Sequence, residues 1–245
     1  MRAVVLGGTK GMGRALARGL AERGDRVFLL GRDLADLERS AKDLEIRGAS
    51  GAVSFATCDL REPDGFAPAL DRAAAALDGF DCVVVTAGVM QDQTRLETDP
   101  RACEALLTID FTNTLLFCEE ARRRLLAAGG GTLCVFSSVA GDRGRKPVVL
   151  YGAAKAGLSH YMEGIDHRFH AEGLRAVLVK PGFVKTGMTA GLEPPPFAGE
   201  PEAVAAHVLR AIDRGRPVVY APPVWRWIMS VIRMLPRAVM RRIGF

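Results

Sequence analysis

The chain has 245 residues, of which 49% are hydrophobic and 25% are charged, and its net charge is +5. This length is enough for one large α/β domain or two small ones, and the composition excludes a disordered chain. The basic excess lies after Asp213, where seven arginines and no acidic residue follow. A charge confined to one end does not indicate nucleic-acid binding.

The cysteines and histidines show no metal-ligand spacing, so we predict no metal site. The cysteines are odd in number and are Cys58, Cys82, Cys103, Cys118 and Cys134. Free cysteines of this kind are typical of the reducing cytosol. Because no apolar run approaches the roughly twenty residues of a membrane span, we expect a cytoplasmic protein, peripheral at most at the inner face of the cell membrane.

Short apolar runs alternate with amphipathic segments along most of the chain. We expect strands at 2–6, 26–30, 52–57, 81–86, 132–136, 174–179 and 217–220. We expect helices at 12–23, 33–47, 63–77, 101–128, 151–172 and 201–213. Apolar strands separated by helices predict a parallel sheet covered on both faces, which is a doubly wound, Rossmann-type α/β fold. We expect one such domain over 1–220, followed by a basic extension over 221–245.

The first turn from strand to helix is rich in glycine. Its candidate cofactor-binding residues are Gly7, Thr9, Lys10, Gly11, Met12 and Gly13. Glycines here permit a tight turn and a close approach of the backbone to a pyrophosphate, whose charge is met by the helix N-terminus. The position of the loop, after a strand and before a helix, favours a dinucleotide site.

The end of the second strand distinguishes between the two nicotinamide cofactors. NAD-binding folds place an acidic side chain there for the ribose hydroxyl, but this chain has Gly31 followed by Arg32. Lys10 is expected on the same side of the cleft, and two cations favour the 2′-phosphate of NADP over NAD. Alternatively, Arg32 is solvated and Asp33 only caps the next helix.

Two further strand ends carry small or polar residues that are suited to a cofactor. Asp59 and Leu60 follow the third strand, and Ala87 and Gly88 follow the fourth. Open α/β sheets bind ligands at the carboxyl ends of their strands, so these residues are candidates for the same site. Ordinary turns at strand ends are the alternative.

The strongest chemical motif combines Ser138 with Tyr151 and Lys155. The spacing of four residues places Tyr151 and Lys155 on one face of a helix, one turn apart. A hydroxyl, a phenol and an ammonium together can orient a carbonyl, donate a proton and tune the donor. A pair of half-exposed residues on a helix is the alternative.

With these residues assembled, the chain resembles the short-chain dehydrogenase/reductase family over about residues 1–220. The resemblance is carried by the glycine loop, Asp59, Ala87, Gly88, Ser138, Tyr151, Lys155, Pro181 and Gly182. It implies that Tyr151 is the general acid in carbonyl reduction, that Ser138 orients the carbonyl, and that Lys155 lowers the pKa of Tyr151 and holds the nicotinamide ribose. It also implies that the strand end with Pro181, Gly182, Val184 and Thr186 borders the nicotinamide.

The chain departs from the family pattern at three places. The glycine motif begins with Leu6 and Gly7 where many members have Thr-Gly, and residues 85–88 read Val-Thr-Ala-Gly in place of Asn-Asn-Ala-Gly. The fourth catalytic residue of the family, an asparagine, aligns with Asp110. We expect Asp110 to accept hydrogen bonds in its place, whereas Asn113, one helical turn further on, is a poor substitute.

Two C-terminal segments have unusual compositions. Residues 185–201 are rich in Gly and Pro, which predicts either a lid over the substrate or a plain surface loop. Residues 224–245 form an amphipathic tail with an arginine stripe and an apolar stripe, which predicts association with a membrane surface. The tail residues that form the apolar stripe are Trp225, Ile228, Ile232 and Leu235. A helix packed on the fold or at a subunit interface is the alternative.

Finer motifs resemble the reductase subunits of bacterial decaprenylphosphoryl-ribose 2′-epimerases. These motifs lie at residues 141–145, 151–158 and 179–186 and in the Trp-, Arg- and Met-rich ending. The resemblance implies a keto-sugar substrate on a polyprenyl phosphate, oxidised beforehand by a flavoprotein partner. It also implies that Arg143 and Arg145 lie near the lipid phosphate, unless they are solvated.

Two other functions remain open from the sequence. A soluble reductase of 3-oxoacyl thioesters or other small ketones would use the same catalytic residues. A non-catalytic sensor or scaffold that binds NADP would keep the cofactor loop, and the changes at Thr86 and Asp110 leave it as an alternative. For any of these functions we expect a homodimer or homotetramer, as is common in the family.

Overall fold

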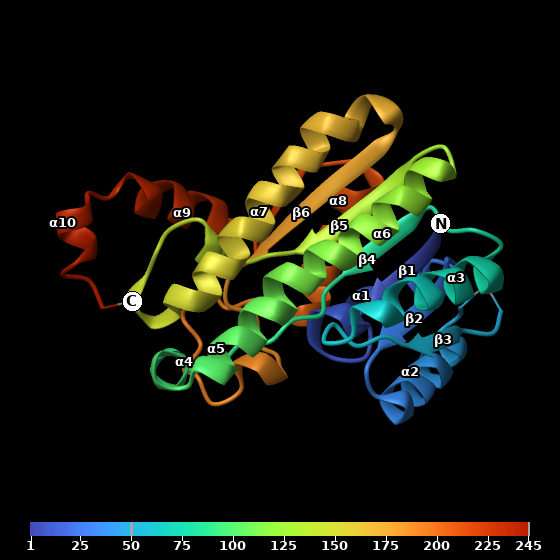
Figure 1. The fold of residues 1–245 in the computed structure, drawn as a ribbon, viewed down its shortest axis with the longest axis horizontal. Helices are drawn as coiled ribbons and strands as arrows, with labels where there is room; N and C mark the ends of the chain where they lie inside the picture. Colours follow the sequence, from blue (N-terminus) through green and yellow to red (C-terminus); the bar gives the residue numbers. More distant parts are fainter. Residues whose placement is uncertain (50, 245) are drawn as a thin grey trace.

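A seven-stranded parallel sheet lies at the centre of the protein in a computed structural model that describes residues 1–49 and 51–244 (Figure 1). The strands are β1 (Arg2–Leu6), β2 (Arg26–Gly31), β3 (Ser54–Thr57), β4 (Cys82–Val85), β5 (Gly131–Phe136), β6 (Leu174–Pro181) and β7 (Val218–Ala221). Their order is β3-β2-β1-β4-β5-β6-β7. The strand order reverses between β1 and β4, which confirms the predicted doubly wound fold.

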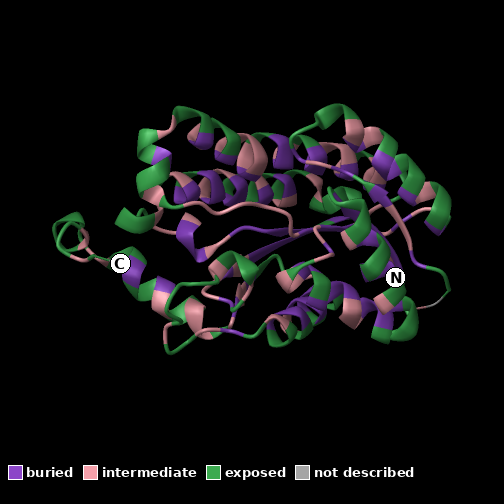
Figure 2. Cartoon of the chain, turned by 90° about the horizontal axis from the view of Figure 1, so that it is seen from below, coloured by how far each residue is buried: buried purple, intermediate pink, exposed green. Residues whose placement is uncertain are grey.

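Helices cover both faces of the sheet because the strands are apolar on both sides (Figure 2). On one face lie α1 (Gly11–Glu22), α2 (Leu34–Ile46) and α8 (Pro201–Asp213). On the other face lie α3 (Phe66–Leu77), α6 (Asn113–Ala127) and α7 (Val149–Phe169). Alternate residues of β1 serve the two cores: Val5 faces the first, and Val4 and Leu6 face the second.

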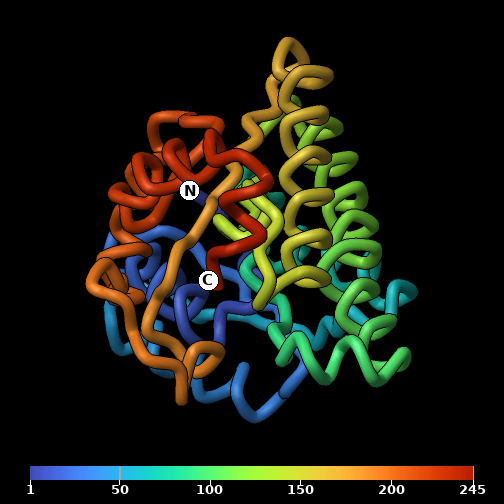
Figure 3. Tube along the Cα trace, turned by 90° about the vertical axis from the view of Figure 1, so that its left-hand side faces the viewer, coloured from blue at the N-terminus to red at the C-terminus, as the bar shows by residue number. Residues whose placement is uncertain are grey.

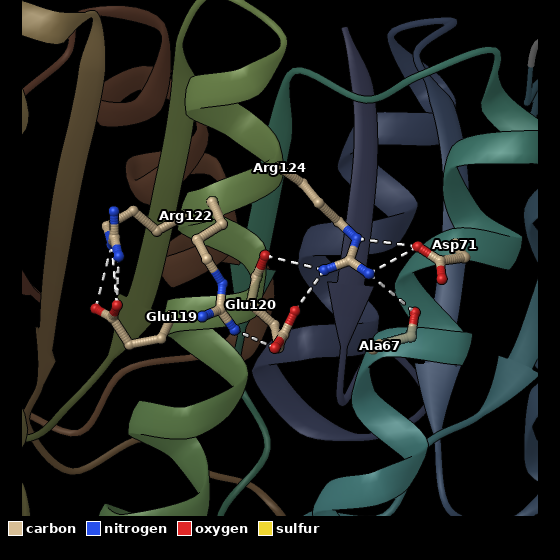
Figure 4. Close-up of polar contacts among 7 residues, drawn as sticks. Ala67, Asp71, Glu119, Glu120, Arg122 and Arg124 are labelled. Carbon is tan, nitrogen blue, oxygen red and sulfur yellow. Dashed lines mark hydrogen bonds and ion pairs between the residues drawn. The ribbon is translucent and has the colours of Figure 1, made fainter.

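Close to the surface, α6 is tied to α3 by ion pairs rather than by apolar packing (Figure 4). The guanidinium of Arg124 donates to Asp71 at 2.7 Å and to the carbonyl of Ala67 at 3.3 Å, and it also pairs with Glu120 of its own helix. Exposed ion pairs of this kind contribute little to stability. The two helices are therefore held mainly by the aromatic core beneath them.

The single helix predicted over 101–128 is wrong, because the structure divides this segment. After α4 (Gln93–Thr98), which was not predicted, come α5 (Pro100–Leu107), a π-helical turn over Thr108–Thr112 and then α6. At the break, the hydroxyl of Thr114 donates to the carbonyl of Ile109 at 2.7 Å, and the amide of Asn113 donates to the carbonyl of Leu60 at 2.6 Å. The π-helical turn contains Asp110, and such turns are frequent at functional sites.

The glycine loop is shaped by the close approach of α1 to the end of β4. A methyl group on Gly13 would lie 2.2 Å from the carbonyl oxygen of Gly7 and 2.3 Å from the Oγ1 of Thr86. Gly7 itself has a φ of +91°, a conformation that favours glycine. These two glycines therefore allow the helix N-terminus to face the carboxyl edge of the sheet.

The C-terminal residues form α9 (Val224–Met234) and α10 (Arg237–Met240), which protrude at one end of the molecule (Figures 1 and 3). Phe245, the last residue of the predicted tail, lies outside the described residues. Before α8 begins at Pro201, the rest of the segment 185–201 forms no α-helix, as its Gly and Pro content predicts, and contains a short 3₁₀ turn at Gly187–Thr189 and a β-bridge from Gly199 to Val184. Within the described residues, no helix combines the length and the apolar character needed to cross a membrane.

The core between α3 and α6 offers a test of the packing. Phe117 is fully buried, and its ring meets that of Phe66 edge to face at a centroid distance of 5.5 Å. We expect Phe117→Ala to lower the free energy of unfolding by about 3–5 kcal/mol in urea denaturation, since it leaves a cavity. Its neighbour Leu116 is 46% exposed, so Leu116→Ala is the matched control with a much smaller loss. Equal losses in the two variants would contradict this packing.

Candidate active site

A cleft of about 320 Å³ lies at the carboxyl ends of the strands, beside the glycine loop. The sequence-predicted cofactor residues that line it are Gly7, Thr9, Lys10, Gly11, Met12, Gly13, Arg32, Asp59, Leu60, Ala87, Gly88 and Thr186. They come from the first four strand ends and the loop after β6. The parallel sheet brings them together because all its carboxyl ends meet at one edge.

The strand end with Pro181 and Val184 supports the cleft from beneath, and neither residue lines it. Pro181 is buried at the end of β6, and Val184 is 2% exposed within a hydrophobic core. Gly182 leaves room for the indole of Trp225, because a methyl group on it would lie 2.1 Å from the Nε1 of that ring.

The sequence analysis did not identify several lining residues as members of the site. These are Leu6, Gly31, Cys58, Thr86, Val89, Ile109, Gly187 and Met188. Most of them are immediate neighbours of predicted residues at strand ends. The rule that ligands bind at the carboxyl ends of parallel strands would therefore have identified them as well. Ile109 and Met188 carry no such signal, because the π-helical turn and the fold of the 185–201 loop place them at the cleft.

The charged residues of the cleft differ in whether they form ion pairs. The ammonium of Lys10 pairs with Asp36 at 2.7 Å, and the guanidinium of Arg61 pairs with Asp59 at 2.6 Å and lowers the pKa of that carboxyl. Arg32 is exposed, and in the part of the chain that the structure describes no carboxylate lies within 4.0 Å of it. Of the two cations predicted to face a phosphate, only Lys10 is therefore ion-paired, and the charge of Arg32 acts on Asp59 at longer range.

Asp33 caps α2, as the alternative interpretation of this strand end expected. Its side chain accepts a hydrogen bond from the backbone N–H of Asp36 at 2.8 Å. Because Asp33 is engaged in this cap, the end of β2 presents no free carboxylate toward the cleft. The cap and the exposed Arg32 are thus compatible features of one turn.

None of the four predicted catalytic residues lines this cleft, but Asp110 and Lys155 lie directly behind its lining residue Gly88. Tyr151 and Lys155 are one turn apart on α7, and the Nζ of Lys155 lies 5.5 Å from the centre of the Tyr151 ring. The Oδ2 of Asp110 lies 3.3 Å from the same Nζ, and its Oδ1 accepts the N–H of Val89 at 2.7 Å. The side chains of Asp110 and Lys155 are 0% and 5% exposed, so this ion pair is dry.

Asn113 does not join the catalytic residues, because its amide is bound to the carbonyl of Leu60. Gly88 connects the catalytic residues to the cleft: a methyl group there would lie 3.1 Å from Asp110 and 3.3 Å from the ammonium of Lys155. Gly88 also lines the cleft, so a ligand bound there would pass close to both side chains. A nicotinamide cofactor fits this arrangement, since its diphosphate would meet the glycine loop and its ribose the ammonium.

Two serines fix the turn of α7 that carries Lys155. The hydroxyls of Ser137 and Ser159 each donate to the backbone carbonyl of Lys155 at 2.8 Å. Ser138, next in the chain, accepts the N–H of Ala140 at 3.1 Å and so caps the 3₁₀ turn that follows β5. Ser138 is therefore held rigidly beside Tyr151 rather than on a mobile loop.

Burial is the largest single influence on the pKa values of Tyr151, Lys155 and Asp110. Burial raises the pKa of Tyr151, and the charge of Lys155 opposes this rise only in part, while Asp110 adds to it. Burial lowers the pKa of Lys155, but Asp110 and Tyr151 outweigh it, so the net shift is upward. Lys155 thus acts on Tyr151 in the predicted direction, but the phenol remains protonated at neutral pH.

Burial raises the pKa of the Asp110 carboxyl, and Lys155 offsets this only partly. An ion pair in a dry site needs further hydrogen bonds, and here Val89 supplies one to the carboxylate. The arrangement can hold a carbonyl by Ser138, protonate it from Tyr151 and stabilise the resulting phenolate by Lys155.

The chain is similar to known proteins along most of its length. A family model described as short chain dehydrogenase matches residues 1–196. An uncharacterized oxidoreductase of Mycobacterium tuberculosis, Rv2073c, is 35% identical over 242 residues, which cover 98% of this chain and 96% of that protein. Carbonyl reductase family member 4 of Xenopus tropicalis is 30% identical over 217 residues, covering 85% of this chain and 89% of that one.

Solved structures show the same likeness. A short-chain type dehydrogenase/reductase from Mycobacterium ulcerans superposes with a TM-score of 0.81 at 25% identity, covering 89% of this chain and 86% of that one. The parallel sheet, the glycine loop and the serine, tyrosine and lysine side chains next to the cleft agree with this likeness. The chain therefore belongs to the short-chain dehydrogenase/reductase family of oxidoreductases, which bind a nicotinamide cofactor.

Proposed function

We propose that this oxidoreductase reduces a ketone to a secondary alcohol, with Tyr151 as the general acid. The observation that carries the proposal is the buried, protonated phenol beside an ammonium and a serine hydroxyl, near a cleft that the glycine loop lines. A general acid must hold its proton at the working pH and release it to the substrate oxygen. Burial of Tyr151 meets the first condition, and the charge of Lys155 favours the second.

In this reaction each residue has one role. Ser138 donates a hydrogen bond to the carbonyl oxygen and orients it, and Tyr151 transfers its phenolic proton to that oxygen as negative charge develops. Lys155 stabilises the phenolate that Tyr151 leaves behind. The nicotinamide cofactor, when bound, supplies the hydride.

We infer that Asp110 acts as the charge partner of Lys155 rather than as the relay asparagine of the family. Its carboxylate lies 3.3 Å from the ammonium, and its other oxygen is bound to the N–H of Val89. In this position it holds the lysine side chain toward Gly88 and the cleft. It also opposes the influence of Lys155 on Tyr151, which favours the protonated phenol.

The preferred cofactor is NADP(H), and Arg32 supports this choice. Its guanidinium lies at the rim of the cleft at the end of β2, where the 2′-substituent of an adenosine ribose would sit. Arginine binds a phosphate group by paired hydrogen bonds, and NADH has no 2′-phosphate to accept them. Lys10 contributes less to this preference, because Asp36 already neutralises it.

The proposed substrate is a keto-sugar linked to a polyprenyl phosphate. An apolar hollow of about 540 Å³ lies against the outer face of α7, between Arg145 and α10. Burial lowers the pKa of Arg145, whose guanidinium has no carboxylate within 4.0 Å among the described residues. A partly buried cation without a partner beside an apolar hollow suits an anionic group on a hydrocarbon chain.

A keto-sugar of this kind is formed by oxidation of an alcohol, which would be the task of the flavoprotein oxidase partner. The alternative is a soluble reductase of 3-oxoacyl thioesters or other small ketones, for which Arg145 would be an incidental loop residue. A higher kcat/KM for a 3-oxoacyl thioester than for the lipid-linked keto-sugar would favour that alternative.

The role of Tyr151 is tested by removing its hydroxyl. We expect Tyr151→Phe to lower kcat by roughly 100- to 10,000-fold, since it removes the proton donor, and to leave cofactor affinity unchanged. Stopped-flow turnover and fluorescence titration of the cofactor measure the two effects. Tyr161→Phe is the control, because the Tyr161 hydroxyl lies on the same helix but is bound to Glu119 at 2.7 Å. Full turnover in Tyr151→Phe would refute the proposed acid.

The cofactor preference is tested at Arg32. We expect Arg32→Gln to weaken NADPH binding by about tenfold to a hundredfold, the size of one charge-assisted interaction, without changing NADH binding. Calorimetric titration of both cofactors measures this. Arg47→Gln, at the far end of α2, is the control and leaves both affinities unchanged. A wild-type protein that binds NADH more tightly than NADPH contradicts the assignment.

A further inference from the structure

The helix α9 has two apolar faces, and only one of them is used to hold it on the fold. On the inner face, Met229 is fully buried and Ile232 is 9% exposed, and both pack against Val139 beside the catalytic Ser138. Trp225 and Ile228 extend this contact. The alternative prediction, that the tail forms a helix packed on the fold, is therefore correct for the inner face of α9.

The outer face of α9 carries a second apolar stripe. Trp227, Val231 and Met234 are 71%, 63% and 84% exposed. Their spacing of four and three residues places them in one line along the helix. Single exposed apolar residues are common on proteins, but a continuous line led by a tryptophan indicates a binding surface. Figure 1 shows this helix at the end of the molecule, away from α2 and α3.

The segment that carries this stripe is basic. The arginines of the two terminal helices and the residues after them are Arg226, Arg233, Arg237, Arg241 and Arg242, and no acidic residue follows Asp213 in the chain. The guanidinium of Arg226 lies 5.9 Å from the ring of Trp227. The loop 143–146 adds three more cations and is joined to the tail, since Arg143 donates to the carbonyl of Leu235 at 2.6 Å.

We propose that the outer stripe of α9 docks on the surface of an anionic lipid bilayer. In this arrangement the three apolar side chains enter the region between headgroups and acyl chains, and the arginines meet the lipid phosphates. Tryptophan is suited to this boundary because its ring is apolar and its N–H is polar. With 11 residues, α9 is too short to span a bilayer and lies in the plane of the surface.

Charge complementarity favours a bilayer over a second copy of this chain. A two-fold symmetric dimer through this stripe would place the arginines of one copy opposite those of the other, and like charges in an interface oppose association. An anionic lipid surface instead offers a negative partner to every one of them. The inner face of α9 contacts Val139, so docking would hold the Ser138 turn close to the bilayer.

Co-sedimentation of the full chain with lipid vesicles tests the proposal, and it needs no turnover. One vesicle is pure phosphatidylcholine and the other contains roughly one-third phosphatidylglycerol. We expect binding to the anionic vesicle only, and we expect high salt to weaken it by screening. The double variant Trp227→Ser with Met234→Ser is expected to bind at least about tenfold more weakly.

Ile46→Ser is the matched control, because Ile46 is 87% exposed at the end of α2 and its change should leave vesicle binding intact. An unchanged unfolding midpoint in all variants shows that the fold is retained. Three outcomes would overturn the proposal: no binding to anionic vesicles, equal binding by the double variant, or a dimer in light scattering that the double variant abolishes. None of these outcomes depends on the proposed reductase reaction.

Discussion

The candidate active site depends on one buried ion pair, between Asp110 and Lys155. Neither side chain reaches water, so both charges must be satisfied by the protein itself. Three parts of the chain meet for this purpose: the loop after β4 through Val89, the π-helical turn through Asp110, and α7 through Lys155. Separating any one of them would leave an unpaired charge in the interior, which is strongly unfavourable.

The same pair determines the chemistry next to it. The Lys155 ammonium favours the phenolate, the Asp110 carboxylate opposes that influence, and burial, the largest cause, keeps the phenol protonated. The hydroxyls of Ser137 and Ser159 bind the backbone carbonyl of Lys155 and so hold the helical turn from which its side chain extends. Because Gly88 has no side chain, the ion pair lies close behind the wall of the cleft that Gly88 forms. These few adjacent contacts therefore determine the charge beside Tyr151, the position of the Lys155 ammonium and its distance from the cleft.

The sequence predicted the features that follow from regular strands and their ends. Apolar strands imply a parallel sheet, and a parallel sheet brings Gly7, Asp59 and Gly88 to one edge without any knowledge of side-chain contacts. The π-helical turn at Thr108–Thr112 was not predictable, because apolar spacing does not distinguish a continuous helix from one with an inserted residue. The pairing of Lys10 with Asp36 was missed for a similar reason, since it depends on side-chain conformation. For the tail, the pattern identified the stripe with Trp225, Ile228 and Ile232, which packs with Val139, but not the second stripe on the exposed face.

Direct titration of Tyr151 tests the central claim that burial keeps this phenol protonated while Asp110 opposes the effect of Lys155 on its pKa. The chain has only three tyrosines, so ¹³Cζ-tyrosine labelling gives three NMR signals, and the one lost in Tyr151→Phe identifies the catalytic residue. In the cofactor-free protein we expect this signal to stay unshifted until the pH exceeds about 10, the ordinary tyrosine value, because burial raises its pKa. In Asp110→Asn the midpoint should fall, since Lys155 then acts on the phenol without a counter-charge. A wild-type signal that titrates near pH 7, or a midpoint that Asp110→Asn leaves unchanged, would contradict the account.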